Sequence, residues 1–215
     1  MTSNNSNEIN YLWNCNDEKT WIKALFHYWE KLSFEQLPIE SRINNLYYRE
    51  LELMSVYEFY NFLYNEFFPW KYTAKNRLAT TRTALKKYET EKRMCDLEVT
   101  KNNIFSPLDK SLEKRIKTVT EIRGLGTSGA TALLSVMFPE TFGTVDQFVV
   151  KALLEVENLS EHNILAQFSP ENLRIKDAVI IIKIMRNKAD ELNIKFNTSF
   201  WTPRKIDMIL WAAGR

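Results

Sequence analysis

The glycine residues of this chain are concentrated in one short stretch. The 215 residues include five glycines, and four of them lie between residues 121 and 151, namely Gly124, Gly126, Gly129 and Gly143. Glycine costs backbone entropy and is used where a chain turns tightly or approaches another group closely. We therefore expect this stretch to hold the most specialised piece of backbone in the chain.

Apolar residues at helical spacing flank this stretch on both sides. Leu112, Ile116 and Val119 predict a helix that ends near Arg123, and a second helix is expected after Ser128. The expected arrangement is a helix, a short Gly-Leu-Gly hairpin and another helix. The N–H groups of the hairpin and of the second helix's first turn would face one spot and accept an anion such as a phosphate. The alternative is that the glycines serve only close helix packing.

At these residues the chain resembles the helix–hairpin–helix DNA glycosylases, which include endonuclease III-like, adenine-mismatch, alkyladenine and 8-oxoguanine enzymes. Family members carry Leu-Pro-Gly-Val-Gly-x-x-Thr-Ala, a hydrophobic helix, and a loop that closes on Val-Asp-x-x-Val-x-Arg. The matching residues here are Gly124, Leu125, Gly126 and Ala130, then residues 142–146, then Val149 and Lys151. The chain departs from the pattern at Arg123, which replaces a proline, and at Phe148 and Lys151, where His and Arg are common.

The resemblance implies that Asp146 is the catalytic carboxylate, placed at a helix N-terminus above the hairpin and facing a cleft between helical lobes. Breaking an N-glycosidic bond develops positive charge on the sugar, so a fixed anion beside the anomeric carbon stabilises the transition state. Such a carboxylate also orients or deprotonates the attacking water. The alternative is that Asp146 only caps a helix, which is a common role for aspartate.

Ser128 bears on the reaction type. It stands 18 residues before Asp146, where strand-cleaving members of the family carry a lysine that forms a Schiff base. Because a hydroxyl cannot form an imine, the resemblance implies a monofunctional enzyme that removes a base and leaves the abasic strand intact. Lys71, Lys75 and Lys117 are the alternative amines, although each is also explained as a phosphate contact or a solvated residue.

The resemblance further implies that the hairpin grips a phosphate of double-stranded DNA. The predicted DNA-contacting residues are Arg123, Gly124, Leu125, Gly126, Thr127, Ser128, Gly129 and Lys151, joined by Lys71, Lys75 and Arg77. Between Lys71 and Arg93 eight basic residues stand against two acidic ones, which indicates either a solvated helix face or a surface that follows DNA phosphates. In the family, hairpin carbonyls often hold K⁺ or Na⁺, here those of Gly124 and Gly126. We expect no other cofactor and no metal bound by side chains.

A stacked base cannot be excised, so the damaged or modified base must be extruded into a pocket. The candidate pocket residues are Trp70, Tyr72, Gln147 and Trp201, with Glu66 as a weaker candidate for reading a base edge. The alternative for the aromatic residues among them is a place in the core, where such residues are found more often. Nothing in the sequence indicates which base is excised, or whether the role is repair or defence against modified foreign DNA.

The helical spacing of apolar residues predicts an all-α chain, to which the resemblance adds the two-lobed glycosylase fold and a monomeric state. Residues 2–8 are polar, and we expect residues 1–16 to form a disordered tail. Residues 17–215 are expected to form the helical domain, with the hairpin and the aspartate within 106–155. Loops are expected at 69–73 and 94–105. Helices are expected to begin at Asp17, Ser106-Pro107, Ser169-Pro170 and Thr202-Pro203.

The remaining composition excludes several classes of protein. No apolar run reaches the ~18 residues of a membrane helix, and the polar N-terminus lacks a signal-peptide core, which predicts a cytoplasmic, nucleoid-associated or nuclear protein. Two cysteines cannot form the four-cysteine iron–sulfur cluster of some family members, and two histidines disfavour zinc. Two alternatives to an enzyme stay open: a non-catalytic helix–hairpin–helix DNA-binding protein and a helical adaptor that binds other proteins.

Overall fold

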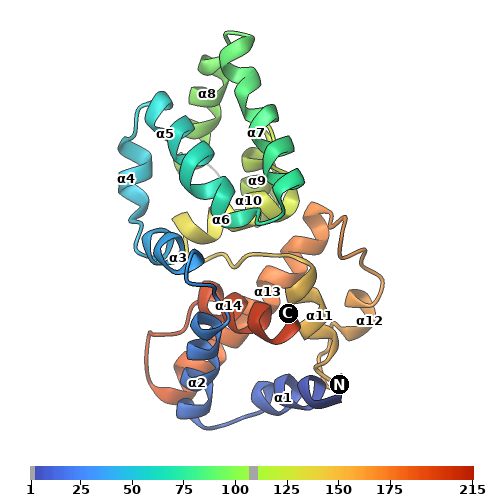
Figure 1. Ribbon diagram of the computed structural model, residues 1–215. Coiled ribbons are helices and arrows are strands. Elements are labelled where there is room, and N and C mark those ends of the chain that lie inside the picture. The colour runs from blue at the N-terminus through green and yellow to red at the C-terminus, as the bar shows by residue number, and fades with distance from the viewer. Residues whose placement is uncertain (1–2, 107–110) are drawn as a thin grey trace. The chain divides into compact units, whose positions relative to one another are not determined.

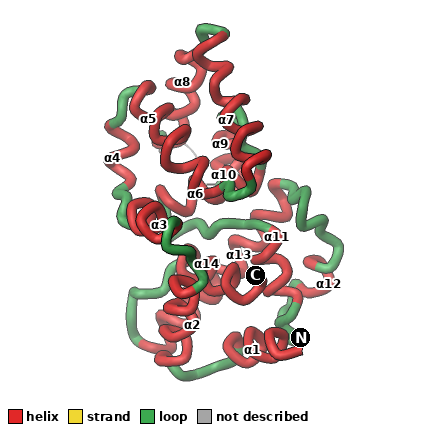
Figure 2. The backbone as a smooth tube through the Cα atoms, in the orientation of Figure 1, coloured by secondary structure: helices red, strands yellow, loops and turns green. Residues whose placement is uncertain are grey.

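The computed structural model describes residues 3–106 and 111–215, and the side chains of residues 8–106 and 111–215. Over these residues the backbone is helical apart from turns and loops, and it contains no strand (Figure 2). The all-α prediction is therefore confirmed. None of the described helices is long and apolar enough to cross a membrane. The predicted helix start at Ser106-Pro107 lies partly outside the described residues.

The chain divides into two compact units, drawn as ribbons in Figure 1. The first unit consists of Met1–Ser33 and Pro139–Arg215, and the second of Phe34–Phe138. Residues 106–155, which carry both parts of the predicted site, are therefore divided between the units after Phe138.

The helices of the first unit come from both ends of the chain. They are α1 (Ser3–Trp13), α2 (Glu18–Glu30), α11 (Gln147–Leu154), α12 (His162–Leu165), α13 (Ile175–Phe196) and α14 (Pro203–Gly214). Two of them begin where the sequence predicts. Asp17 caps α2 through Thr20 N–H at 3.0 Å, and Thr202 caps α14 through Lys205 N–H at 3.3 Å.

A buried cluster of tryptophans forms part of the core of the first unit. The ring centroid of Trp21 lies 6.3 Å from that of Trp13 and 5.9 Å from that of Trp201. Trp201 is only 1% exposed. The prediction that Trp201 lines a base pocket is therefore wrong, because its ring faces are covered by the core of its own unit.

The predicted disordered tail over residues 1–16 is also wrong, because Ser3–Trp13 form α1. Ile9, Leu12 and Trp13 are buried, and Lys188 of α13 donates to the Trp13 carbonyl at 3.0 Å and to Glu191 at 2.6 Å. Burial lowers the pKa of Lys188, and the carboxylate of Glu191 opposes that shift. A cation at the last carbonyl of a helix is a favourable cap, and here it fastens α1 to α13.

The second unit is built from consecutive helices. They are α3 (Gln36–Asn44), α4 (Tyr48–Leu53), α5 (Val56–Phe62), the π-helix η1 (Leu63–Phe67), α6 (Phe68–Lys71), α7 (Lys75–Thr90), α8 (Met94–Phe105), α9 (Leu112–Thr120) and α10 (Thr127–Met137). The predicted loop at 94–105 is wrong, because those residues form α8. Its buried positions, Leu97, Thr100, Lys101 and Ile104, keep helical spacing although two of them are polar.

Two further predicted boundaries differ from the structure. Residues 68–71 are helical and do not begin a loop, because Phe68 N–H already bonds five residues back to Leu63 and Pro69 then lies in the first turn of α6, where a proline is tolerated. The long helix α13 begins at Ile175 and not near Ser169. Its start is fixed by Asp177, which accepts Arg174 N–H at 3.0 Å.

We predict that Lys188→Met loosens α1, because the Trp13 carbonyl loses its donor and Glu191 keeps only Lys195. A buried acceptor left without a partner costs about 1–3 kcal/mol. Thermal unfolding and limited proteolysis within α1 measure the effect, and Lys183→Met, an exposed lysine on the same helix, is the control. Equal proteolysis of the two variants would show that Lys188 does not fasten α1.

Candidate functional site

The turn between α9 and α10 packs tightly against α7. Leu125 N–H donates to the Ile122 carbonyl at 3.0 Å, and Gly124 has a φ of +95°. A Cβ at Gly124 would lie 2.8 Å from the Thr81 carbonyl of α7. Gly124 is therefore required both by its left-handed backbone and by the close approach of α7.

The N-terminus of α10 is open where the turn ends. Gly126 caps the helix and is exposed, and a Cβ built on it would meet no atom within 4 Å. No acceptor among the described residues is paired with the N–H groups of Thr127 and Ser128 in the first turn. Such groups carry the positive end of the helix dipole, so this end of α10 is suited to an anion.

Tyr72 connects the open turn to the basic residues of α7. Its hydroxyl occupies the space that a Cβ of Gly129 would need, which explains the glycine in the first turn of α10. The Arg77 guanidinium lies 5.5 Å from the centroid of the Tyr72 ring, and Lys75 is exposed in the first turn of α7. Burial raises the pKa of Tyr72, which Arg77 opposes. Tyr72 thus supports the turn and has no free face for a base.

Arg123 is engaged within its own unit. Its guanidinium pairs with Glu91 at 2.6 Å and lies 4.9 Å from the centroid of the Tyr88 ring, while its N–H donates to the Tyr88 hydroxyl at 3.2 Å. The Tyr88 hydroxyl in turn donates to the Glu121 carbonyl at 3.1 Å. These contacts tie the turn to the C-terminal end of α7, so the side chain predicted to contact DNA serves the turn itself.

The other candidates of the second unit also have protein partners. The Trp70 indole N–H donates to Glu40 at 2.5 Å, and its ring lies 5.6 Å from that of Phe67. Glu66 accepts from Arg42 at 3.3 Å. Lys71, the last residue of α6, is half-buried. Trp70 and Glu66 are thereby held to α3 by hydrogen bonds.

In the first unit, the segment that leads to Asp146 is clamped from both sides. Thr144 N–H donates to Asp207 at 2.6 Å, and the second oxygen of Asp207 accepts from Arg204 at 2.7 Å. Asp207 is only 1% exposed. A Cβ at Gly143 would lie 2.7 Å from both the Pro203 carbonyl and the Met185 methyl group. The sequence gives no sign of the Asp207 and Arg204 roles, because polar residues in an amphipathic helix normally face solvent.

Asp146 itself is the N-cap of α11. Its Oδ1 accepts from Phe148 N–H at 3.1 Å and from Val149 N–H at 3.3 Å, and the residue is half-buried. These bonds fix the carboxylate in one orientation at the positive end of the α11 dipole. The capping role that the sequence allows is thus present, and any chemical role would be additional to it.

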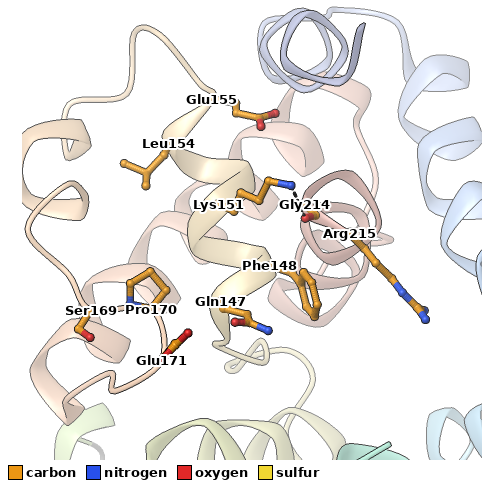
Figure 3. Close-up of a pocket in the computed structure, with 10 residues that line it drawn as sticks. All are labelled: Gln147, Phe148, Lys151, Leu154, Glu155, Ser169, Pro170, Glu171, Gly214 and Arg215. Atoms are coloured by element: carbon orange, nitrogen blue, oxygen red, sulfur yellow. Dashed lines mark hydrogen bonds between the residues drawn. The ribbon is translucent and has the colours of Figure 1, made fainter. Parts of the chain in front are cut away.

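A groove of about 740 Å³ follows α11 from the residue after Asp146 (Figure 3). Its lining consists of Gln147, Phe148, Lys151, Leu154, Glu155, Ser169, Pro170, Glu171, Gly214 and Arg215. Figure 3 shows Lys151 bonded to the Gly214 carbonyl, at 3.1 Å. Two predicted residues, Gln147 and Lys151, therefore share one concave surface with polar and apolar walls.

The predicted residues thus form two groups, each within one unit. The turn with Tyr72, Lys75 and Arg77 belongs to the second unit, and Asp146 with Gln147 and Lys151 belongs to the first. Ser128, the second residue of α10, is half-buried. No group of three or more His, Cys, Asp or Glu side chains in the described part of the chain could hold a metal ion.

Gly124→Ala should lower the free energy of unfolding by about 1–3 kcal/mol, because alanine is strained at this φ and its methyl group meets the Thr81 carbonyl. Gly126→Ala is the matched control, since that backbone is extended and the space is open, and it should cost less than about 1 kcal/mol. Thermal unfolding followed by circular dichroism compares the two. Equal stabilities would contradict the packing of the turn on α7.

Comparison with known proteins assigns no family to the chain. No protein-family model, curated protein or solved structure matches it.

Proposed function

We propose that this chain is a monomeric DNA glycosylase that hydrolyses the N-glycosidic bond of a damaged or modified base in double-stranded DNA. The proposal includes the two-lobed helical fold and the helix–hairpin–helix motif of the family that the sequence resembles. One observation carries it: the backbone two residues before Asp146 is held by a buried carboxylate that is itself paired with a buried arginine. A helix cap alone does not need such support, whereas a catalytic group must be held within fractions of an ångström.

The second unit supplies the grip on the DNA backbone. A phosphate at the open end of α10 would accept from the N–H groups of Thr127 and Ser128, and α7 would add the charges of Arg77, which lies against the Tyr72 ring, and of Lys75. The carbonyl of Gly124 accepts no hydrogen bond from the described residues, and that of Gly126 accepts one, from Ala130 N–H. Both carbonyls therefore fit a K⁺ or Na⁺ ion, which when bound would neutralise charge on the phosphate.

Asp146 carries the reaction in this proposal. Its carboxylate stabilises the positive charge that develops on the sugar as the base departs, and it orients the attacking water. Gln147, the next residue, lines the groove along α11 and offers an amide that can donate to and accept from a base edge. Ser128 provides no amine, so the abasic strand stays intact unless Lys71, Lys75 or Lys117 acts as the nucleophile.

The competing candidate is a DNA-binding protein without catalysis. It is favoured by the two backbone N–H groups that Asp146 already satisfies, since these explain an aspartate at this position without any chemistry. The two candidates share the DNA grip of the second unit and differ only in the role of the Asp146 charge.

Asp146→Asn separates the two candidates, because asparagine caps a helix as well as aspartate does but carries no charge. For the enzyme, base excision should fall by about 10²–10⁴-fold while thermal stability and duplex affinity are kept. The assay uses duplexes that each carry one alkylated purine, oxidised guanine, mispaired base or hypermodified base, and hot alkali reveals abasic sites. Asp190→Asn, at an exposed position on α13, is the control.

Two results would contradict the enzyme. The first is duplex binding by the wild-type protein without excision of any base in the panel. The second is unchanged excision by Asp146→Asn. Strand breaks that form without alkali would instead contradict the monofunctional mechanism and direct attention to the three alternative lysines.

Lys75→Ala and Arg77→Ala should each weaken duplex binding and reduce the slope of log affinity against log salt by about 0.9, because each removes one phosphate contact. A salt titration by fluorescence anisotropy measures both quantities. Lys183→Ala, in the first unit, is the control and should leave the slope unchanged. A slope that neither α7 variant changes would place the duplex elsewhere on the protein.

A further inference from the structure

Four aromatic rings of the second unit contact one another in a row, which we call the ring row. The ring centroids of Tyr47 and Tyr48 are 5.3 Å apart, those of Tyr48 and Phe138 are 6.1 Å apart, and those of Phe138 and Phe105 are 6.4 Å apart. None of the four belongs to the core, since Tyr47 is 58% exposed and the other three are half-buried. The row therefore presents aromatic surface to solvent.

Two arginines lie over rings of the row. The Arg49 guanidinium is 6.0 Å from the centroid of Tyr48 and donates to its hydroxyl at 3.2 Å, and the Arg115 guanidinium is 5.1 Å from the centroid of Phe138. The acid nearest to Arg49 in sequence, Glu50, accepts from Tyr47 N–H at 3.4 Å and pairs with Arg42 at 3.5 Å. The row thus combines flat apolar faces with positive charge.

A groove of about 360 Å³ between α8, α9 and α10 adjoins the row, because Arg115 belongs to both. Its polar lining consists of Asn103, Ser106, Lys114, Arg115, Thr118 and Glu121. Two cations, two hydroxyls and an amide stand there against one carboxylate. Such a lining suits a chain of phosphates, which need positive charge and hydrogen-bond donors.

The ring row is separated from the open turn of α10, while the groove runs along α9 as far as Glu121. Phe138 follows the last residue of α10 and Arg115 lies early in α9, whereas the turn joins the opposite ends of these two helices. The 11 residues of α10 span about 16 Å, so the ring row and the turn cannot contact the same nucleotide.

We propose that the ring row and its adjoining groove bind single-stranded nucleic acid. Bases stack on the exposed aromatic faces, and the phosphates lie along Arg49, Lys114 and Arg115. Neighbouring rings and guanidinium groups match a ligand that alternates flat rings with negative charge. A protein partner would not require the cations and hydrogen-bond donors that line the groove. This site is independent of Asp146 and of the duplex contact at α10, and it would remain in a protein without glycosylase activity.

The test measures the fluorescence anisotropy of a fluorescein-labelled oligothymidylate of about 12 nucleotides, within the usual site sizes of such surfaces. Tyr47→Ala should weaken binding about fivefold or more, because a base loses its stacking partner, while Tyr47→Phe should bind as the wild type does. Arg49→Ala should lower the salt slope by about 0.7. Tyr11→Ala removes a tyrosine of similar exposure, 67%, from the first unit and should change nothing.

Three results would overturn the proposal. One is an absence of single-strand binding by the wild-type protein. Another is equal affinity of Tyr47→Ala, Arg49→Ala and Tyr11→Ala. The third is a loss of single-strand binding in Lys75→Ala or Arg77→Ala but not in the ring-row variants, which would place the strand at α7. Asp146→Asn should leave single-strand affinity unchanged, so the outcome is independent of whether the protein excises bases.

Discussion

The buried pair of Asp207 and Arg204 is the interaction on which the first unit's candidate site depends. Burying two charges is expensive, and the pair is tolerated only because each partner meets the other at hydrogen-bonding distance and Asp207 also accepts Thr144 N–H. Arg204 N–H further donates to the Pro139 carbonyl at 3.3 Å. These hydrogen bonds therefore hold the start of α14 and residues 139–146 together, and Asp146 is the last residue of that segment.

The turn before α10 in the second unit is also held in one conformation, but by a different kind of contact. This turn is fixed by contact distances and not by charge: Gly124 sits against the Thr81 carbonyl and Gly129 against the Tyr72 hydroxyl. Both glycines are required because a neighbouring atom occupies the place of a side chain. Each of the two groups of predicted residues is consequently held in place by contacts within its own unit.

The sequence predicted the fold where the signal is local and failed where it depends on a distant partner. The caps at Asp17 and Thr202 mark helix starts through their own side chains, so α2 and α14 begin where expected. In contrast, the sequence does not predict α8, because a lysine stands at a core position. The burial of Lys101 depends on the Glu52 carbonyl, to which it donates at 2.6 Å. The burial of α1 likewise depends on Lys188, at the far end of the chain.

The same limit applies to the candidate site. The glycine turn and the aspartate cap could be predicted, since glycine and aspartate have narrow backbone roles, whereas the placement of the aromatic residues could not. The sequence around Trp201 would look the same whether the ring lined a pocket or packed in a core. Only its contact with Trp21 and its burial show that it packs in the core.

The π-helical turn η1 has a consequence for how the second unit tolerates changes in length. η1 holds about one residue more than α-helical winding would place over the same turn, because its hydrogen bonds span five residues and not four. Deleting one residue between Leu63 and Phe67 would let this stretch wind as an α-helix without turning the helices that follow, so Trp70 would stay beside Glu40. The second unit should therefore accept the loss of one residue in η1, whereas the same deletion in the α-helical part of α5 would rotate Trp70 by about 100° around the axis, away from Glu40.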